Sequence, residues 1–479
     1  MSKLLQASQL EDVGSEFEEV DLGDRRLDVR VQSMAVALAL RPDRGFTSAM
    51  TRPCDAEAAY RFLRNPRVDA EAVLDPHFYK SVARIREAGT ALVIHDTSEF
   101  KYSGDSERKG LGALRASEQG FLGHFSLAVS SDGSRRPLGV VAMSTWTRDR
   151  QPKRRKKVPK RSGWVCSKQP NKESARWQDQ IDEVAERCAD LSIVHVADRE
   201  ADAYPLLLHL VSKGHQFVIR MARERCARAD ELAELETVRS IAARAQDVVV
   251  TEVAVHKRKG AALPRMGVAR DARSARLAFA AARVQIKRPY YLFGEAMWLD
   301  VNVVHVYEID PPADEEPIDW MLFTSEPIDT SDDLRRVVDY YRTRWMIEEY
   351  FKALKTGCAM EKRELESYDT LRNALSLFVP IAFHMLLLRD VARSAQDEPA
   401  NAVLTESQIE VLTAMKRLRP NPTARHALLA VAELGGYYNK QRPPGWRVLA
   451  RGMHDLFVHQ HGWLLARSAG IAEKDAIKR

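Results

Sequence analysis

Two short apolar runs that each lead into an aspartate constrain the fold of this chain more than any other feature. Ala91–His95 precedes Asp96, and Ile193–Ala197 precedes Asp198. Short runs of apolar and β-branched residues predict buried strands. In open α/β sheets, ligands bind in the crevice outside the carboxyl ends of the strands. We therefore expect an α/β protein with a mixed sheet, in which both aspartates stand at strand ends.

A third acidic residue, Glu348, lies in a segment with helical periodicity. The same segment contains Tyr341, Arg344, Lys352 and Lys355. On a continuous helix, the side chains of Tyr341, Arg344 and Lys355 would lie on the same face as Glu348, within about 60° of one another. Basic residues on that face could hold phosphates beside the acid. The alternative is an amphipathic helix with internal ion pairs.

The three acidic residues together suit a pair of divalent cations. Mg²⁺ and Mn²⁺ prefer carboxylate oxygens, and one aspartate can bridge two ions about 3.5–4 Å apart. Such a pair activates a water or a 3′-hydroxyl and stabilises the leaving oxygen of a phosphoryl transfer. His95 and His195 should point to the other face of the sheet, so they are not expected to be ligands. Three scattered acids alone would be a weak signal, since most are solvated.

The positive charge of the chain is unevenly placed. The net charge is only +6, but residues 151–161 contain seven Lys or Arg and no acidic residue. Such a run attracts phosphate backbones, or it is a solvated loop. The sequence leaves both interpretations open.

Length and composition predict a multidomain globular protein. A chain of 479 residues exceeds one ordinary core, so two or three domains are expected. The five cysteines lie far apart without a Cys-x-x-Cys motif, which indicates neither a zinc site nor disulfide bonds and fits a reducing cytosol. The acidic N-terminus is no signal peptide.

The most apolar stretch of the chain, Leu377–Leu388, is interrupted by Pro380 and His384. It is shorter than the roughly 20 residues that a membrane span needs. We therefore expect a buried helix, no membrane partner and a cytoplasmic location.

The first 70 residues predict a small helical module rich in arginine. One helix follows the apolar period of residues 27–38, and a second covers Ala56–Arg64 with Asp55 as its cap. Arg61 and Arg64 lie on the second helix. They either contact DNA or are solvated, and the sequence does not decide between these roles.

The middle of the chain predicts strands that alternate with helices, and its C-terminal part is helical. Strands are expected at residues 91–95, 125–129, 137–144, 193–197, 217–220 and 320–324, and helices at 75–87, 175–189 and 203–212. Residues 246–310 are β-rich, with a basic turn at 257–260, and would be inserted before the last strand. Ser331 is expected to cap the helix that carries Glu348, and residues 372–479 are mostly helical.

A series of motifs in these segments resembles one known family. Residues 341–355 resemble the Tyr-Arg-Glu-Lys signature of the insertion-sequence-four transposases, a family that includes the Tn-five transposase. Residues 94–98 and 198–202 resemble the motifs around its two catalytic aspartates. Further similar strings are residues 22–26, 58–65, 172–177, 320–327, 434–436, 444–445 and 451–452. The motifs follow the order of the family over nearly the whole chain.

The resemblance implies a ribonuclease-H-like mixed sheet with a β-rich insertion, flanked by N- and C-terminal helical domains. Its domains would be an N-terminal DNA-binding domain over residues 1–72, a catalytic domain over 73–371 with the insertion at about 222–325, and a C-terminal dimerisation domain over 372–479. Asp96, Asp198 and Glu348 would be the catalytic metal ligands.

The resemblance also implies a set of DNA contacts. The DNA-binding residues would be Tyr341, Arg344, Lys352, Lys355, Trp320, Arg220, Arg61 and Arg64. Trp320 would stack on a base flipped out of the transposon end. Packing in the core is the alternative role for this tryptophan.

The expected function is a cut-and-paste DNA transposase that uses two Mg²⁺ or Mn²⁺ ions per active site. Water cuts one strand at the element's end, the freed 3′-hydroxyl forms a hairpin with the opposite strand, and after opening it joins target DNA. The partners would be transposon-end and target DNA and a second copy of the chain, in the nucleoid of a bacterium. Two alternatives are a catalytically inactive end-binding regulator and a metal nuclease that does not transpose.

Overall fold

The chain forms two compact units. In the computed structural model, the described residues are 10–50, 52–103, 107–115, 118–148, 173–245, 248–255, 271–292, 294–313, 315–394, 397–438 and 443–477. The first unit comprises Met1–Thr90, Thr97–Lys153 and Met346–Arg479, and the second comprises Ala91–Asp96 and Arg154–Trp345. The predicted basic segments at 151–161 and 257–260 lie outside the described residues.

The first unit starts with a helical module. Its elements are η1 (Leu10–Phe17), α2 (Arg25–Leu40), α3 (Phe46–Ala49), α4 (Pro53–Arg64) and α5 (Ala70–Ala88). Helix α2 buries Val31 and Leu38 on one face, as its apolar period predicts. The prediction that Asp55 caps the next helix is wrong. Helix α4 starts at Pro53, whose missing N–H is not needed in a first turn, so Arg52 is the N-cap and Asp55 lies inside the helix.

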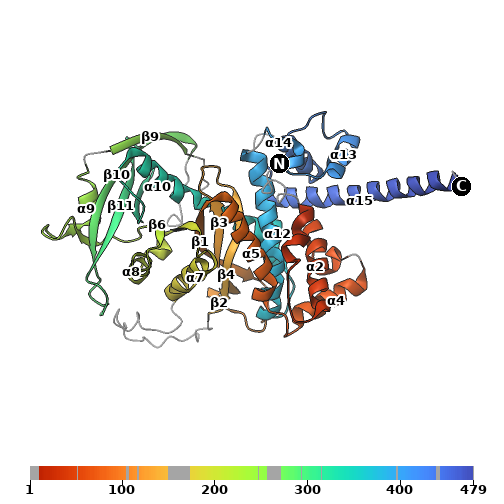
Figure 1. The fold of residues 1–479 in the computed structure, drawn as a ribbon, viewed down its shortest axis with the longest axis horizontal. Helices are drawn as coiled ribbons and strands as arrows, with labels where there is room; N and C mark the ends of the chain where they lie inside the picture. Colours follow the sequence, from red (N-terminus) through yellow and green to blue (C-terminus); the bar gives the residue numbers. More distant parts are fainter. Residues whose placement is uncertain are drawn as a thin grey trace. The chain divides into compact units, whose positions relative to one another are not determined.

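A small sheet completes the N-terminal half of the first unit. It contains β2 (Gly112–Arg115), β3 (Glu118–Ser130), β4 (Pro137–Trp146) and the second part of β1 (Thr90–Tyr102). The order is β2-β3-β1, with β4 antiparallel to β3. Helix α5 covers β4 (Figure 1) so closely that a Cβ at Gly139 would lie 2.0 Å from the Ser81 hydroxyl. The glycine therefore permits the close helix–sheet contact.

One long helix, α12 (Tyr368–Ser394), forms the core of the first unit. It packs against α2, α4 and α5 (Figure 1). Pro380 lies inside it without ending it, so the helix is longer than the predicted Leu377–Leu388. By length and composition alone it could cross a membrane, but 89% of its most apolar window is buried inside the protein, as in a core helix. The later elements are η6 (Ala400–Ala402), α13 (Glu406–Ala414), α14 (Ala424–Leu434) and α15 (Trp446–Ile477).

The second unit is built on a mixed sheet, as the sequence predicts. Its strands are the first part of β1, β5 (Ser192–Ala197), β6 (Gln216–Arg220), β7 (Cys226–Arg228), β8 (Glu236–Thr237), β9 (Val248–Val255), β10 (Arg273–Lys287), β11 (Trp298–Ile309) and β12 (Asp319–Thr324). The order is β1-β5-β6-β12-β11-β10-β7-β8, with β9 beside β10. Strands β5 and β6 are parallel, whereas β6, β12, β11 and β10 pair antiparallel. The predicted β-rich stretch thus continues the sheet that contains β5.

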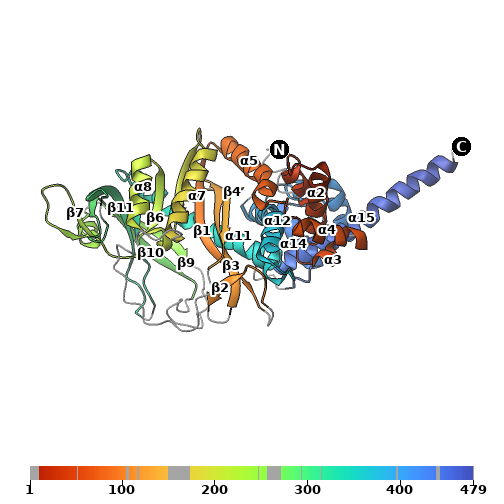
Figure 2. The same ribbon diagram turned by 90° about the horizontal axis from the view of Figure 1, so that it is seen from below.

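Helices of the second unit pack against several strands of this sheet. They are α7 (Glu173–Arg187), α8 (Tyr204–Lys213), α9 (Val238–Ala242) and α10 (Ser331–Thr343). Helix α8 connects β5 to β6, as a crossover between parallel strands must. Helices α7 and α8 lie side by side over these strands (Figure 2). Trp177, Leu207 and Phe217 are among the side chains that form the core between them.

The segment that carries Glu348 is not one continuous helix. Helix α10 ends at Thr343, α11 covers Trp345–Lys352, and residues Ala353–Gly357 form a π-helical turn. The tight backbone bond from Arg344 N–H to Tyr341 O marks the interruption. Arg344 itself keeps helical dihedral angles (φ −48°, ψ −31°), whereas the π-helical turn that contains Lys355 departs from the 3.6-residue period on which the predicted angle rests. The predicted cap is also wrong by one residue: Thr330 caps α10 in a reciprocal pair with Asp333.

Candidate active site

Asp96 stands where the buried part of β1 ends. The strand is buried from Ala91 to His95 and becomes partly exposed at Asp96. The strand itself does not end there, contrary to the prediction, but continues to Tyr102. Its second part consists mainly of polar residues, with Phe100 and Tyr102 buried between them. This half-buried pattern lacks the apolar run that marked the first part.

Asp198 lies just beyond the end of β5, as predicted. It caps the short helix η2 (Arg199–Ala201), and its carboxylate accepts a hydrogen bond from Glu200 N–H at 2.8 Å. Strands β1 and β5 are neighbours in the sheet. The structure therefore places Asp96 and Asp198 on adjacent strands of the second unit, at its partly exposed margin.

Asp202 anchors the turn that follows Asp198. Its side chain is fully buried, accepts hydrogen bonds from the N–H groups of Ala222 and Arg223 at 2.7 and 3.2 Å, and forms an ion pair with Arg225. These contacts tie the turn after β5 to the turn after β6. Sequence reasoning placed Asp202 in a motif without giving it a role, because its partners lie 20 or more positions away.

Arg344 pairs directly with Asp96. The guanidinium Nη1 lies 3.3 Å from the carboxylate Oδ2, and the two side chains are 15% and 16% exposed. Partial burial strengthens such a pair relative to a fully solvated one. Arg344, one of the basic residues predicted to hold phosphate, thus lies beside a predicted metal ligand.

His95 and His195 precede the two aspartates in the chain and lie in the buried part of the sheet. Both rings are essentially inaccessible, and His95 Nε2 lies 2.9 Å from His195 Nδ1 in a hydrogen bond. Burial lowers the pKa of His195 well below its ordinary value, and His95 and His215 add to this. The pair links β1 to β5 in the buried part of the sheet.

Three predicted DNA contacts come together around Trp320. This residue of β12 is partly exposed. The Tyr341 ring meets it edge-on at 5.4 Å, and the Arg220 guanidinium lies 5.7 Å from its ring centre. Tyr341 is buried at 6% exposure, so its ring supports Trp320 from the side of α10. Trp320 is therefore neither a core residue nor a free surface residue.

Glu348 and the two lysines belong to the first unit. Glu348 is partly exposed on α11. Lys352 pairs with Glu349 at 2.7 Å. Lys355 donates a hydrogen bond to Glu99 O and lies 3.6 Å from Glu361. Burial lowers the pKa of Lys355, and Glu361 opposes that shift.

The arginines of α4 are exposed, and each forms an ion pair at the surface. Arg61 lies 3.7 Å from Glu57, one turn earlier, and Arg64 lies 3.2 Å from Glu366. Exposed pairs of this kind contribute little to stability. The guanidinium groups therefore remain accessible to another partner, which fits the DNA-binding alternative as well as the solvated one.

Comparison with known proteins defines the class. Residues 13–68 match the family model for transposase DNA-binding domains, and residues 165–379 match the model for the transposase DDE domain. The chain therefore carries a transposase DNA-binding domain and a DDE transposase domain. The presence of both domains in one chain supports a DNA transposase. The second match contains Asp198 and Glu348, whereas Asp96 precedes it.

A solved structure gives a more distant likeness. The chain is similar to the piggyBac transposase in a synaptic complex with hairpin DNA, at 9% identity, over 96% of this chain and 81% of that one. The TM-score is 0.32. At that value the likeness carries no argument, and the class rests on the two matched domains.

Proposed function

We propose that the chain is a cut-and-paste DNA transposase of the insertion-sequence-four type, similar to the Tn-five transposase. The observation that supports this most is the position of Asp96 and Asp198 on neighbouring strands, because two aspartates and a DDE domain suit metal-dependent phosphoryl transfer. The proposal includes a ribonuclease-H-like core and the domain boundaries 1–72, 73–371 and 372–479, with the insertion at about 222–325.

Asp96, Asp198 and Glu348 would hold the metal ions. All three are partly exposed carboxylates, the donors that Mg²⁺ and Mn²⁺ prefer, so the donor set fits two ions. When bound, the ions would lower the pKa of a water or 3′-hydroxyl and stabilise the leaving oxygen. Asp202 would keep Asp198 in position through the backbone bonds described above.

The basic and aromatic side chains would hold DNA. Arg344, 3.3 Å from Asp96, would place a guanidinium beside the reacting phosphate. Trp320 would stack on a base at the element's end, with Arg220 and Tyr341 fixing its ring. The remaining phosphate contacts would come from Lys352, Lys355, Arg61 and Arg64.

The rest of the reaction follows from the family resemblance. The freed 3′-hydroxyl would form a hairpin, and after reopening it would join target DNA. Two copies of the chain would act together on two transposon ends, in the nucleoid of a bacterial cell. An end-binding regulator without catalysis is the competing function.

The decisive experiment measures cleavage and binding together. Asp96→Ala, Asp198→Ala and Glu348→Ala should each abolish Mg²⁺-dependent nicking of end DNA while leaving its binding largely intact. Glu234→Gln, at an exposed carboxylate of the same protein, is the matched control and should leave both unchanged. Nicking retained in all three alanine variants would refute the assignment. Binding without nicking by the unmodified protein, in Mg²⁺ and in Mn²⁺, would favour the regulator.

A further inference from the structure

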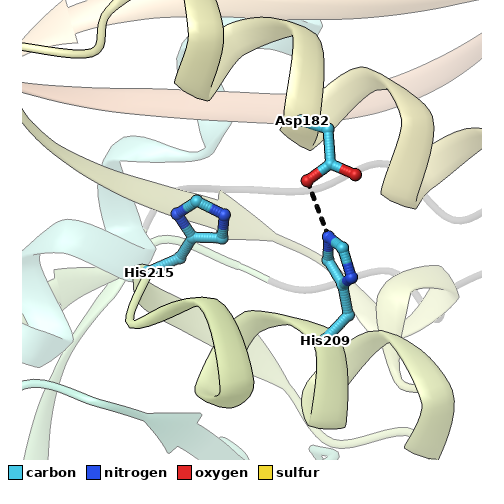
Figure 3. Close-up of side chains that lie close together, drawn as sticks. All are labelled: Asp182, His209 and His215. Carbon is cyan, nitrogen blue, oxygen red and sulfur yellow. Dashed lines mark hydrogen bonds and ion pairs between the residues drawn. The ribbon is translucent and has the colours of Figure 1, made fainter.

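A second cluster of metal-binding side chains lies in the helical layer of the second unit. Asp182 comes from α7, His209 from α8, and His215 from the turn that leads into β6 (Figure 3). One possible ligand atom from each of the three lies within 4.8 Å of the others. Figure 3 shows the Asp182 carboxylate above His209 and the His215 ring beside them.

The backbone holds His215 next to His209. Helix α8 ends at Lys213, and Gly214 adopts a left-handed conformation with φ of +71°. His215 N–H then donates to Leu210 O at 2.9 Å, which closes the turn back onto the helix. A residue six positions after His209 is thereby returned to the last turn of α8.

The polar groups of the cluster are incompletely satisfied. His209 Nε2 lies 2.7 Å from Asp182 Oδ1. Among the residues that the structure describes, His215 Nε2 is buried and has no hydrogen-bond partner. A buried polar atom without a partner costs roughly 1–3 kcal/mol. Burial lowers the pKa of His215, and His209 adds to this shift, whereas Asp182 opposes it.

We propose that Asp182, His209 and His215 form a transition-metal site that takes Zn²⁺, separate from the proposed ligands of the active site. Two imidazoles and one carboxylate are a donor set that suits zinc, whereas Mg²⁺ prefers oxygen alone. Zinc bonds of about 2.0–2.1 Å require donors about 3.3 Å apart in a tetrahedron. The three donors would have to reach that spacing by side-chain rotation, and Asp182 is exposed and both histidines are partly exposed. Water would complete the tetrahedron.

The position of the cluster indicates what the metal does. Helix α7 leads into β5, and α8 follows the turn that contains Asp198. An ion held by both helices would brace the strand that carries this aspartate. The His215 ring also lies 5.4 Å from the His195 ring, which is hydrogen-bonded to His95 beside Asp96. Zinc would therefore be a structural brace for the second unit and would leave phosphoryl transfer to the carboxylates.

Metal binding to the full-length protein tests the site. After removal of metal with EDTA, the protein should take up one tight equivalent of Zn²⁺, with a rise of several degrees in melting temperature. Co²⁺ at the same site should give the intense visible absorption of a tetrahedral nitrogen and oxygen complex. Co²⁺ at an all-oxygen, octahedral site would give only weak absorption.

Variants separate this cluster from other sites. The pair His209→Ala and His215→Ala should lose the tight equivalent and the intense Co²⁺ spectrum. The matched control removes two exposed histidines of α15, His459→Ala with His461→Ala, and should keep both. Asp96→Ala with Asp198→Ala should also keep both, which distinguishes this site from the active site.

A conservative variant tests the site even if the double-histidine variant fails to fold. Asp182→Asn keeps the hydrogen bond to His209 but should weaken Zn²⁺ binding by about tenfold or more. Unchanged Zn²⁺ affinity in the double-histidine variant, or a weak octahedral Co²⁺ spectrum in the unmodified protein, would overturn the proposal. So would Zn²⁺ binding to Asp182→Asn that matches the unmodified protein.

Discussion

Two carboxylates, one in each unit, are both paired with arginine but stand in opposite environments. Glu16 in the first unit is fully buried and contacts His77 at 2.7 Å, His384 at 3.0 Å and the guanidinium of Arg84. Asp96 in the second unit is 16% exposed, and its pairing with Arg344 is longer, at 3.3 Å. The first carboxylate is surrounded by three fixed partners. The second is partly exposed, so another ligand can reach it.

The difference distinguishes a carboxylate that holds the fold from one that is available for chemistry. Burial raises the pKa of Glu16, but Arg84, His77 and His384 together outweigh it and hold the pKa well below its usual range. Glu16 joins η1, α5 and α12, so its ionised form ties the helical module to the core helix. Metal ligation by Glu16 would require breaking these buried contacts, whereas Asp96 is partly exposed and its pair with Arg344 is partly solvated.

The largest expected effect is on catalysis at Asp96. Asp96→Asn removes the charge and keeps the size, and should reduce nicking of end DNA by about 10³-fold or more. The stability change should stay within about 1 kcal/mol, because the pair with Arg344 is partly solvated. Single-turnover nicking and urea unfolding measure the two quantities on one preparation. A large stability loss would mean that Asp96 resembles Glu16 and that the contrast fails.

The reciprocal effect is expected at Glu16. Glu16→Gln should lower the free energy of unfolding by about 3–5 kcal/mol, because it leaves the buried Arg84 charge without its partner. Glu18→Gln, at an exposed residue two positions away that pairs with Lys80 at 3.7 Å, should change it by less than about 1 kcal/mol. Nicking per folded molecule should be unchanged in both. Equal stabilities of the two variants would contradict the role given to Glu16.

The stabilising contribution of Glu16 should depend on pH. The lowered pKa of Glu16 stabilises the fold above the ordinary value of 4.5, and that contribution is lost as the pH falls below 4.5 and through the lowered pKa. The groups that face Glu16 are Arg84, His77 and His384. The stability difference between the unmodified protein and Glu16→Gln should therefore shrink as the pH falls from 5 to about 3. A constant difference over this interval would exclude an ionised Glu16 as the cause.

These contacts also show how much the sequence could predict. Asp198 was placed correctly after its strand because an apolar run and its end are local features. The interruption at Arg344 was missed, since the helical period continues through it and the residue itself keeps helical dihedral angles. Local patterns reveal where a carboxylate stands in its own element, but not which distant segment supplies its partner.

The distant partners illustrate that limit. Arg344 and Asp96 are 248 positions apart, and His384 and Glu16 are 368 apart. No periodicity connects such pairs. The resemblance of motifs supplied candidate residues for the active site, yet it offered nothing for Glu16. The cluster around His209 was missed for a related reason, because Asp182 lies 27 positions away and forms no short metal-binding motif with it.

The smallest expected effect concerns Trp320, which is intermediate between a buried residue that holds the fold and an exposed residue that is available to a ligand. Its ring is partly exposed and supported by Tyr341 and Arg220. Base stacking on such a ring contributes roughly 1–3 kcal/mol. Trp320→Ala should therefore slow hairpin formation more than the first nick, because an unstacked terminal base frees the backbone to bend.

Trp177 is the matched control for this substitution. It belongs to the same unit, lies on α7, and is only 5% exposed within the core of that unit. Trp177→Ala should lower the free energy of unfolding by about 3–5 kcal/mol, whereas Trp320→Ala should lower it by clearly less, since part of its surface is already in water. Urea unfolding gives both stabilities, and gel assays of nicked and hairpin DNA give both rates. If Trp320→Ala matched the stability loss of Trp177→Ala and slowed nicking and hairpin formation equally, Trp320 would be a core residue and its stacking role would be wrong.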